Sequence, residues 1–348
     1  MAVIWSFPGE ENRRSNPYTA TLVAELRQLG HSTTVPGWSG RLFRRCDIIH
    51  LHWPQKVIQQ SLPASLRSIT AWLVFLAVQK AKGARIVWTV HNVASHEGLR
   101  PRLERWWMKR LMRLLDGVHA LSDSSLREAG AAYPAILQKH PLVAPHWTYD
   151  GAYPAPKPAT GPRSIAFLGD LKDYKGLDLL LAALEAAEPD GRRYVVHGLP
   201  VDGLDADVLR DRLQALRERG WHLEFVLERL SEQELADRLA EAGLLVLPYR
   251  KGQNSGLAIL AAERGTPVLV SRLPAFQPLL DELGPPRAVA IDSPLSQAQI
   301  AHSFDAATAV AGSIDSDFVA RRAPARIVLE ISNYYLFLME RGGGSTSR

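Results

Sequence analysis

The residues Tyr249–Gly256 have types and spacings that suit the binding of an anion. They follow a short apolar run, Leu244–Pro248, that predicts a buried strand, and they precede an apolar run that predicts a helix. Asn254 and Ser255 are favourable residues at a helix start, and Gly256 lets a ligand come close to the backbone. A helix N-terminus has unpaired N–H groups and the positive end of the helix dipole, so the pattern predicts an anion site. An ordinary capped helix is the alternative.

A second loop, Gly169–Gly176 (GDLKDYKG), has a similar character. It leaves the expected strand Ser164–Leu168, and Lys172 and Lys175 stand just before a helix that is expected to begin at Gly176. Positive charge beside a helix N-terminus suits a diphosphate. A loop with two solvated lysines is the alternative.

Imidazole and carboxylate groups gather near the ends of the expected strands in the first half. The strand Asp47–His52 contains two histidines, and the strand Arg85–His91 ends in another, with His96 and Glu97 a few residues beyond it. Such groups can accept a proton from a hydroxyl group during catalysis. His91, His96 and Glu97 do not have the helical His-Glu-x-x-His spacing, which makes a zinc site the less favoured interpretation.

Strands alternate with helices in both halves, which predicts parallel, doubly wound sheets and an α/β fold. In the first half, the expected strands are Val3–Phe7, Asp47–His52, Arg85–His91 and Gly117–Leu121, and the expected helices are Tyr18–Leu29, Ala64–Lys82, Arg102–Leu115 and Ser124–Ala132. In the second half, the expected strands are Ser164–Leu168, Tyr194–Gly198, Leu223–Leu227, Leu244–Pro248 and Val268–Val270, and the expected helices are Gly176–Ala187, Asp205–Arg219, Ser231–Ala242 and Leu257–Glu263.

The two halves predict two domains. The first domain is expected over residues 1–150 and the second over 163–326, joined by a linker at 151–162 that is rich in Pro, Gly and Ala. A helix at 327–340 is expected to pack back on the first domain, and residues 341–348 are expected to be a disordered tail. Ligands of open α/β sheets bind outside the carboxyl ends of the strands, so the expected site is a cleft between the domains.

Length and composition limit the class of protein. The 348 residues suffice for two α/β domains. Cys46 is the one cysteine, so no internal disulfide can form and a reducing compartment is expected. The N-terminus reads as a strand rather than a secretory signal. The longest apolar run, Ala71–Val78, is shorter than the roughly 18–20 residues that cross a bilayer.

Charge is distributed unevenly along the chain. Residues 1–160 carry 20 Lys and Arg against 10 Asp and Glu, whereas residues 161–348 carry 21 against 26. A basic half predicts a polyanionic partner. Within it, Leu99–Leu115 combines basic residues with Trp and Leu at helical spacing, as in a helix that lies on an anionic bilayer. A helix that packs its apolar stripe on its own core is the alternative. The residues expected to face the membrane are Arg102, Arg105, Trp106, Trp107, Lys109 and Arg113.

Taken together, these positions resemble a known family. The chain is similar over nearly its whole length to GT-B glycosyltransferases. It is most similar to the bacterial exopolysaccharide mannosyltransferases of the xanthan type, which act on lipid-diphosphate-linked oligosaccharides. The residues that carry the resemblance are Asn16–Tyr18, Asp47–Pro54, Thr89–Asn92 with His96 and Glu97, Leu168 and Gly169, Tyr174–Gly176, Leu247–Tyr249, Asn254–Gly256, and Pro267 with Val268.

The resemblance implies a GT-B fold, in which two Rossmann-like domains face a cleft, and transfer of a hexose from a nucleotide sugar. GDP-mannose is the expected donor, a lipid-linked glycan the expected acceptor, and no cofactor or metal is expected. The enzyme is expected on the cytoplasmic face of the plasma membrane. The expected donor-binding residues are Gly169, Lys172, Lys175, Gly176, His197, Arg229, Tyr249, Asn254, Ser255 and Gly256. The expected acceptor-binding residues are Asn16, Tyr18, His52, Trp53 and Asn92, with Glu97 as the first choice of general base and His91 as the second.

Two departures bear on the chemistry. Retaining members of the group usually carry two glutamates eight positions apart around the donor-binding helix, but the corresponding stretch here is Gly252–Leu260 and neither end is Glu. Glu263 lies further along and does not match. Asp170 stands where an arginine often follows the glycine of the donor phosphate loop. The resemblance therefore implies an inverting transfer.

Three other functions stay open. A nucleotide-sugar epimerase on a similar fold would need no lipid acceptor, and a non-catalytic GT-B scaffold would have no turnover. The pI near 9.3 also permits nucleic-acid binding. However, the positive charge is confined to one half and no nucleic-acid motif is present, so no nucleic-acid partner is expected.

Overall fold

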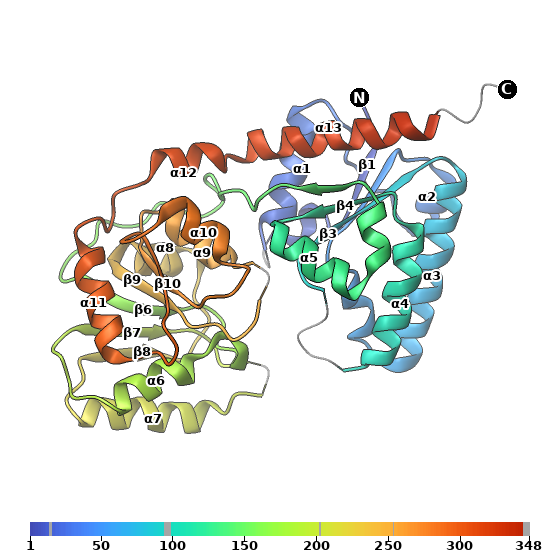
Figure 1. Cartoon of the computed structure of the whole chain (residues 1–348). Coiled ribbons are helices and arrows are strands. Elements are labelled where there is room, and N and C mark those ends of the chain that lie inside the picture. The colour runs from blue at the N-terminus through green and yellow to red at the C-terminus, as the bar shows by residue number, and fades with distance from the viewer. Residues whose placement is uncertain (14–15, 94–98, 202, 253, 344–348) are drawn as a thin grey trace. The chain divides into compact units, whose positions relative to one another are not determined.

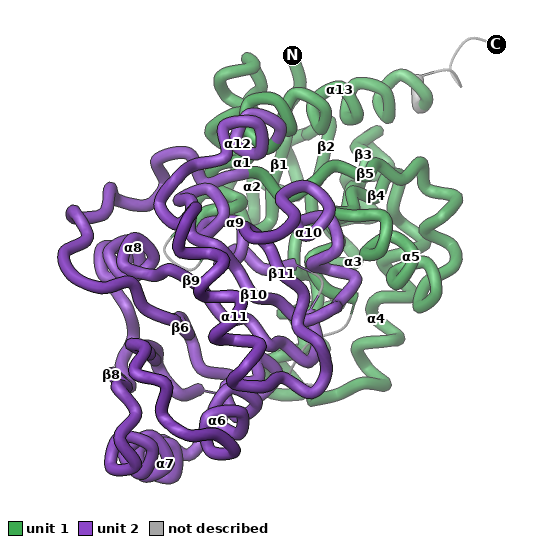
Figure 2. The backbone as a smooth tube through the Cα atoms, turned by 60° about the vertical axis from the view of Figure 1, so that its left-hand side comes forward, with its two compact units in different colours: residues 1–147, 322–348 green, residues 148–321 purple. Residues whose placement is uncertain are grey.

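The computed structural model describes residues 1–13, 16–93, 99–201, 203–252 and 254–343. The chain divides into two compact units (Figure 2). The first unit contains Met1–Trp147 and Arg322–Arg348, and the second contains Thr148–Arg321. The chain therefore leaves the first unit after Trp147 and returns to it at Arg322.

The first unit is built on a parallel sheet (Figure 1). The hydrogen bonds between its strands give the order β1-β2-β3-β4-β5. Its strands are β1 (Ile4–Phe7), β2 (Ile48–Leu51), β3 (Arg85–Val90), β4 (Gly117–Ala120) and β5 (Pro141–Val143). Its helices are α1 (Tyr18–Gln28), α2 (Trp38–Phe43), α3 (Leu62–Ala81), α4 (Pro101–Leu114), α5 (Asp123–Ala132) and α13 (Pro324–Gly343). Short 3-10 turns are η1 (Glu10–Asn12), η2 (Pro54–Ile58) and η3 (Pro134–Gln138).

Alternate residues of this sheet point to opposite faces, as the period of a strand requires. Ile4 and Val87 pack with α1 and α13 on one face. Trp5, Ile86 and Trp88 pack on the other face with α3 and α4. The sheet is therefore covered on both faces, which is why its strands read as continuous apolar runs.

The second unit is a six-stranded parallel sheet with strand order β11-β10-β9-β6-β7-β8. Its strands are β6 (Ser164–Leu168), β7 (Arg193–His197), β8 (Leu223–Val226), β9 (Ala242–Leu247), β10 (Val268–Val270) and β11 (Ala288–Ala290). Helices α6 (Leu177–Glu185), α7 (Ala206–Glu218) and α11 (Gln297–Thr308) cover one face. Helices α8 (Glu232–Glu241), α9 (Gly256–Glu263), α10 (Gln277–Leu283) and α12 (Ser316–Arg321) cover the other, and η4 (Asp173–Lys175) precedes α6.

Side-chain caps fix several helix starts at the residues that the sequence pattern indicates. The Oγ atoms of Ser122 and Ser255 accept the N–H groups of residues three positions later, which starts α5 and α9. Asp205 caps α7 in the same way. Ser231 and Glu234 form a capping box at the start of α8.

Some expectations need correction. Residues 151–162, expected as a linker, belong to the second unit, where Arg264 donates to the carbonyls of Tyr153 and Pro154 and the Lys157 N–H donates to Asp237. The final helix begins before residue 327 and continues to Gly343, so only residues 344–348 of the expected tail lie outside the described residues.

Helix α3 lies within two residues of its expected bounds, Ala64–Lys82, and it contains the apolar run Ala71–Val78. Among the described residues, it is the helix that is long and apolar enough to cross a membrane. Core helices of soluble proteins pass the same test. Ile69, Phe75 and Leu76 of α3 are buried against the sheet of the first unit. These residues pack α3 on the first unit, but only 28% of its apolar stretch is buried, whereas the core helix of a soluble protein is mostly buried.

Candidate active site

Glycines bring three strand ends of the second unit close together. A Cβ atom on Gly198 would lie 1.9 Å from the carbonyl oxygen of Gly169, and one on Gly176 would lie 2.2 Å from that of Pro248. Gly169 and Gly176 also have positive φ angles of 91° and 71°, which other residues rarely adopt. The loops after β6, β7 and β9 can therefore meet only because these positions are glycine.

Lys175 lies at the centre of this arrangement. Its Nζ is 3.6 Å from the position that a Cβ would take on Gly169. Burial lowers the pKa of the Lys175 ammonium, with smaller opposing effects of Tyr174 and Asp170. Among the residues that the structure describes, no hydrogen bond or ion pair is formed by this ammonium. A half-buried cation with an unfilled bonding capacity suits a phosphate group. Lys172 begins the same turn, and its carbonyl accepts the Lys175 N–H.

The start of α9 forms the second part of the expected donor site. Ser255 Oγ accepts the Ala258 N–H at 3.3 Å, which leaves other first-turn N–H groups of α9 able to bind an anion. Tyr249 is buried beneath this loop, and burial raises the pKa of its hydroxyl to about 12 despite a hydrogen bond with Ser255. The Tyr174 ring packs edge-on against Tyr249 at 5.8 Å. Asn254 lies in the same loop and has polar interactions of its own.

His197 and Arg229 lie after the two neighbouring strands. His197 is buried at the end of β7, burial lowers its pKa, and its Nδ1 has no hydrogen-bond partner among the described residues. Arg229, beyond the end of β8, forms an exposed ion pair of 3.7 Å with Asp170. Asp170 is thus paired with an arginine that follows a different strand.

In the first unit, four expected residues come together at the ends of β2 and β3. Trp53 stacks on His91 with ring centroids 4.3 Å apart. His52 Nδ1 lies 3.1 Å from His91 Nε2. The Tyr18 ring packs edge-on against His91 at 4.7 Å. Burial holds the pKa values of His52 and His91 well below the usual range, so both rings are neutral. A neutral His91 can accept a proton, but only as a weak base.

The other expected residues on this side have mixed outcomes. Tyr18 and His52 are completely buried and therefore support the site rather than present their side chains to an acceptor, which corrects the expectation of direct binding. Asn16 Oδ1 accepts the Tyr18 N–H at the start of α1. The Asn92 carbonyl accepts from Gln55. Glu97, the first choice of base, lies with His96 outside the described residues.

Sequence reasoning missed a chain of buried polar groups behind His52. The contacts run from Tyr335 Oη to His50 Nδ1, from His50 Nε2 to Thr89 Oγ1, and from Thr89 Oγ1 to His119 Nδ1, at 2.6, 2.6 and 3.0 Å. The chain ends where His119 Nε2 lies 3.0 Å from the Ala144 carbonyl oxygen. A carbonyl oxygen can only accept a hydrogen bond. We assign the proton of His119 to Nε2 and that of His50 to Nε2 from this end point. The periodicity of α13 gave no signal that Tyr335 completes this chain.

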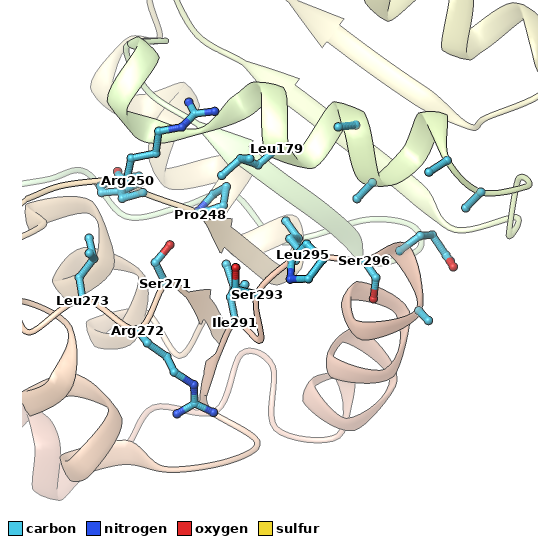
Figure 3. Close-up of a pocket in the computed structure, with 18 residues that line it drawn as sticks. Leu179, Pro248, Arg250, Ser271, Arg272, Leu273, Ile291, Ser293, Leu295 and Ser296 are labelled. Carbon is cyan, nitrogen blue, oxygen red and sulfur yellow. The ribbon is translucent and has the colours of Figure 1, made fainter.

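Among the described residues, no three His, Cys, Asp or Glu side chains are placed to hold a metal ion. A cavity of about 890 Å³ does lie beside the loop after β9 (Figure 3). Leu179, Pro248, Arg250, Ser271 and Leu295 are among its lining residues. The cavity shares Pro248, Tyr249 and Arg250 with the segment that leads to the donor loop, but neither Lys175 nor Ser255 lines it.

Of the residues on helix α4 that are expected to face a membrane, some are exposed and one is buried. Trp107 is 1% exposed, packs in the core and donates to the Pro54 carbonyl, so the expectation of an interfacial role for Trp107 is wrong. Adjacent residues of a helix lie about 100° apart, and Trp106 is accordingly 44% exposed. The basic side chains on the exposed face are Arg102, Arg105, Lys109, Arg110 and Arg113.

Comparison with known proteins identifies the architecture. No protein-family model matches the chain. The GDP-mannose:glycolipid 4-beta-D-mannosyltransferase of Xanthomonas campestris pv. campestris is 25% identical over 317 residues, which cover 90% of this chain and 83% of that protein. The corresponding protein of strain ATCC 33913 is 24% identical over the same shares.

Solved structures of low sequence identity share the fold. Sucrose-phosphate synthase from Thermosynechococcus elongatus has a TM-score of 0.67 at 16% identity, covering 97% of this chain and 99% of its own. HepE from Anabaena, in complex with UDP-glucose, has a TM-score of 0.65 at 12% identity, covering 97% and 100%. With two parallel α/β sheets, glycosyltransferase neighbours and glycosyltransferase relatives, the chain is a glycosyltransferase of the GT-B type.

Proposed function

We propose that this enzyme transfers mannose from GDP-mannose to a lipid-diphosphate-linked oligosaccharide, with inversion and without a metal ion. The observation that carries the proposal is the similarity to the Xanthomonas mannosyltransferase across nine-tenths of the chain. The Lys175 ammonium beside Gly169 and the glycine geometry of the second unit support a nucleotide-sugar diphosphate as the donor. The product would belong to exopolysaccharide or other cell-surface glycan synthesis.

The proposed reaction is a single displacement. An acceptor hydroxyl oxygen attacks C1 of the sugar, the bond from C1 to the phosphate oxygen breaks, and GDP leaves with the electron pair. The hydroxyl proton passes to a general base, for which Glu97 is the first choice and His91 the second. Lys175 and the N–H groups at the start of α9 stabilise the charge that develops on the leaving diphosphate.

The surroundings of Glu263 support inversion over retention. Glu263 is the last residue of α9, and its two carboxylate oxygens accept the N–H groups of Tyr149 and Asp150 at 2.7 and 2.9 Å. Both oxygens therefore have structural hydrogen bonds. This carboxylate is not placed to replace the pair of glutamates that retaining members carry.

The proposal is tested by incubation of the purified enzyme with GDP-mannose, GDP-glucose, UDP-glucose or UDP-galactose and a bacterial membrane-lipid extract. We expect transfer of mannose from GDP-mannose, a β-glycosidic product by NMR, and unchanged turnover in EDTA. An α-linked product would contradict inversion, and loss of turnover in EDTA would contradict metal independence. Preference for a UDP-sugar would contradict the proposed donor.

The same assay separates the alternative functions. An epimerized nucleotide sugar in the reaction without lipid extract would indicate an epimerase. No turnover with any donor, despite nucleotide binding, would indicate a scaffold.

We propose further that the first unit binds the cytoplasmic face of an anionic membrane, where a lipid-linked acceptor would lie. Helices α2, α3 and α4 contain eight Lys and Arg residues but only one acidic residue, the buried Glu104. The same helices expose large apolar side chains, including Trp38, Phe43, Val74 and Trp106, of which Phe43 is 84% exposed. Basic residues beside exposed aromatic residues suit the interface of an anionic bilayer.

A further inference from the structure

The chain passes from the first unit to the second at Trp147 and Thr148, and the first-unit side of this passage is held firmly. Trp147 is completely buried and stacks on Tyr18, with ring centroids 3.8 Å apart. Arg322 donates to the carbonyl of His146 at 2.8 Å. Because Tyr18 also packs against His91, the residues just before the chain leaves the first unit support the expected acceptor side.

The second-unit side is held by helix α9. The N–H groups of Tyr149 and Asp150 both donate to the Glu263 carboxylate at the end of that helix. A carboxylate that accepts two backbone N–H groups fixes the chain direction as well as its position. The Tyr149 carbonyl accepts the Ala152 N–H at 2.9 Å, so the chain turns immediately afterwards.

Tyr149 also reaches the opposite end of α9. A Cβ atom on Gly256, the first residue of the helix, would lie 2.1 Å from Tyr149 Oη. The hydroxyl therefore occupies the space beside the helix start, and Tyr149 spans α9 from its first residue to its last. Burial raises the pKa of Tyr149 well above its usual value, so the hydroxyl stays protonated.

We infer that Tyr149 is a positioning residue that links nucleotide binding at the start of α9 to the Trp147–Tyr18 stack beside His91. The inference rests on the proposed function, because it requires the donor diphosphate to bind at that helix start. Only Thr148 separates Trp147 from Tyr149, so their Cα atoms can be at most roughly 7 Å apart. A displacement of Tyr149 must therefore be taken up close to Trp147.

Hydrogen exchange provides a direct readout of this link. The Tyr149 and Asp150 amides are bonded to Glu263, so they exchange only when the segment separates from α9. A diphosphate that stabilises the start of α9 lowers the population of the separated state and slows their exchange. The Tyr18 N–H, which donates to Asn16, reports on the other end of the link.

The experiment measures hydrogen exchange by mass spectrometry with GDP and, separately, UDP as probes. In the unmodified enzyme, we expect saturating nucleotide to slow exchange by about five-fold or more in the segments 149–150, 18–22 and 169–176. Tyr149→Phe removes only the hydroxyl. In this variant, we expect slowing at 169–176 to persist, while slowing at 149–150 and 18–22 falls below about two-fold.

Tyr153→Phe is the matched control, because Tyr153 packs edge-on against Tyr149 at 5.2 Å without approaching Gly256. This variant should respond to nucleotide as the unmodified enzyme does. Slowing at 169–176 without slowing at 149–150 in the unmodified enzyme would overturn the link and leave the donor site standing. An unchanged response in Tyr149→Phe would also overturn it. No slowing at any segment with either nucleotide would overturn both the donor site and the link.

Discussion

Lys175 is the residue on which the donor proposal depends most directly. Its ammonium lies beside Gly169, where a diphosphate could approach the backbone, and burial already lowers its pKa. A charge-assisted contact to phosphate is strong in such a place because little water competes with it.

Replacement of Lys175 by Ala should raise the Kd for GDP-mannose by about ten-fold or more, on the order of 1.5–3 kcal/mol. Isothermal titration calorimetry measures this directly. Lys157→Ala is the control, because the Lys157 side chain is 77% exposed and lies outside the expected donor site. Equal affinity of the two variants would remove Lys175 from the donor site.

Glu97 and His91 are rival bases, and their chemistry differs. Glu97→Gln keeps the shape of the side chain but removes its basicity, so turnover should fall by roughly 10²–10⁴ while the Kd for the donor stays unchanged. His91 is neutral and weakly basic because burial lowers its pKa. Steady-state rates of Glu97→Gln and His91→Asn decide between them, and near-normal turnover of Glu97→Gln would transfer the role to His91.

Helix α4 shows what a sequence pattern can and cannot predict about a helix. The apolar and basic residues correctly predicted a helix with two faces. They could not assign Trp106 and Trp107, which are identical in type and adjacent in sequence, because burial depends on how the helix is rotated against the sheet. The prediction missed helices α2, α10, α11 and α12 and strands β5 and β11. All of these except the 12-residue α11 are short and gain their stability from neighbouring elements.

The candidate site was predictable to a similar degree. The strand ends and the caps, such as Ser255, follow from local pattern. Packing decides that Tyr18 and His52 are buried. Strand order decides that Arg229, which follows a strand two positions away in the sheet, forms an ion pair with Asp170. The hydroxyl of Tyr335 reaches His50 across 285 positions of sequence, which no local period can indicate.

Binding to lipid vesicles tests the membrane proposal for α4. We expect the enzyme to cosediment with vesicles that contain phosphatidylglycerol, less so at high salt, because each basic residue near the surface contributes about 1 kcal/mol and salt screens this term. Reversal of Arg102, Arg105, Lys109 and Arg113 to Glu should remove most of the binding, and Phe43→Ser should weaken it.

The matched control reverses four exposed basic residues of the second unit, Arg210, Arg217, Lys251 and Arg272. This variant should still cosediment with the same vesicles. If both charge-reversal variants lost binding equally, or if the enzyme bound neutral vesicles as well as anionic ones, α4 would have no specific membrane role.

For the whole molecule, the buried histidines of the first unit predict acid sensitivity. Burial lowers the pKa values of His119 and His146 to about 4. In the unfolded chain the same groups have pKa values near 6.5, so the unfolded state binds protons first as the pH falls. Their contribution to the free energy of unfolding is complete above about pH 6.5 and is lost between about pH 6.5 and pH 4.

The expected loss is on the order of 3 kcal/mol for each histidine over that interval. Urea-induced unfolding at pH 7.5, 6 and 5 measures it. His119→Gln should reduce the dependence on pH, whereas His222→Gln, at an exposed position, should leave it unchanged. The same dependence in both variants would exclude His119 as a cause.

The return of α13 to the first unit has a consequence for synthesis on the ribosome. Ile327, Val328 and Ile331 of α13 cover Leu22 and Leu26 in one of the unit's apolar cores. A nascent chain that has emerged as far as Trp147 therefore still lacks the helix that closes this core, and the helix arrives only after all of the second unit has been translated. The part encoded first is the part completed last, and a premature stop late in the gene would damage the beginning of the protein.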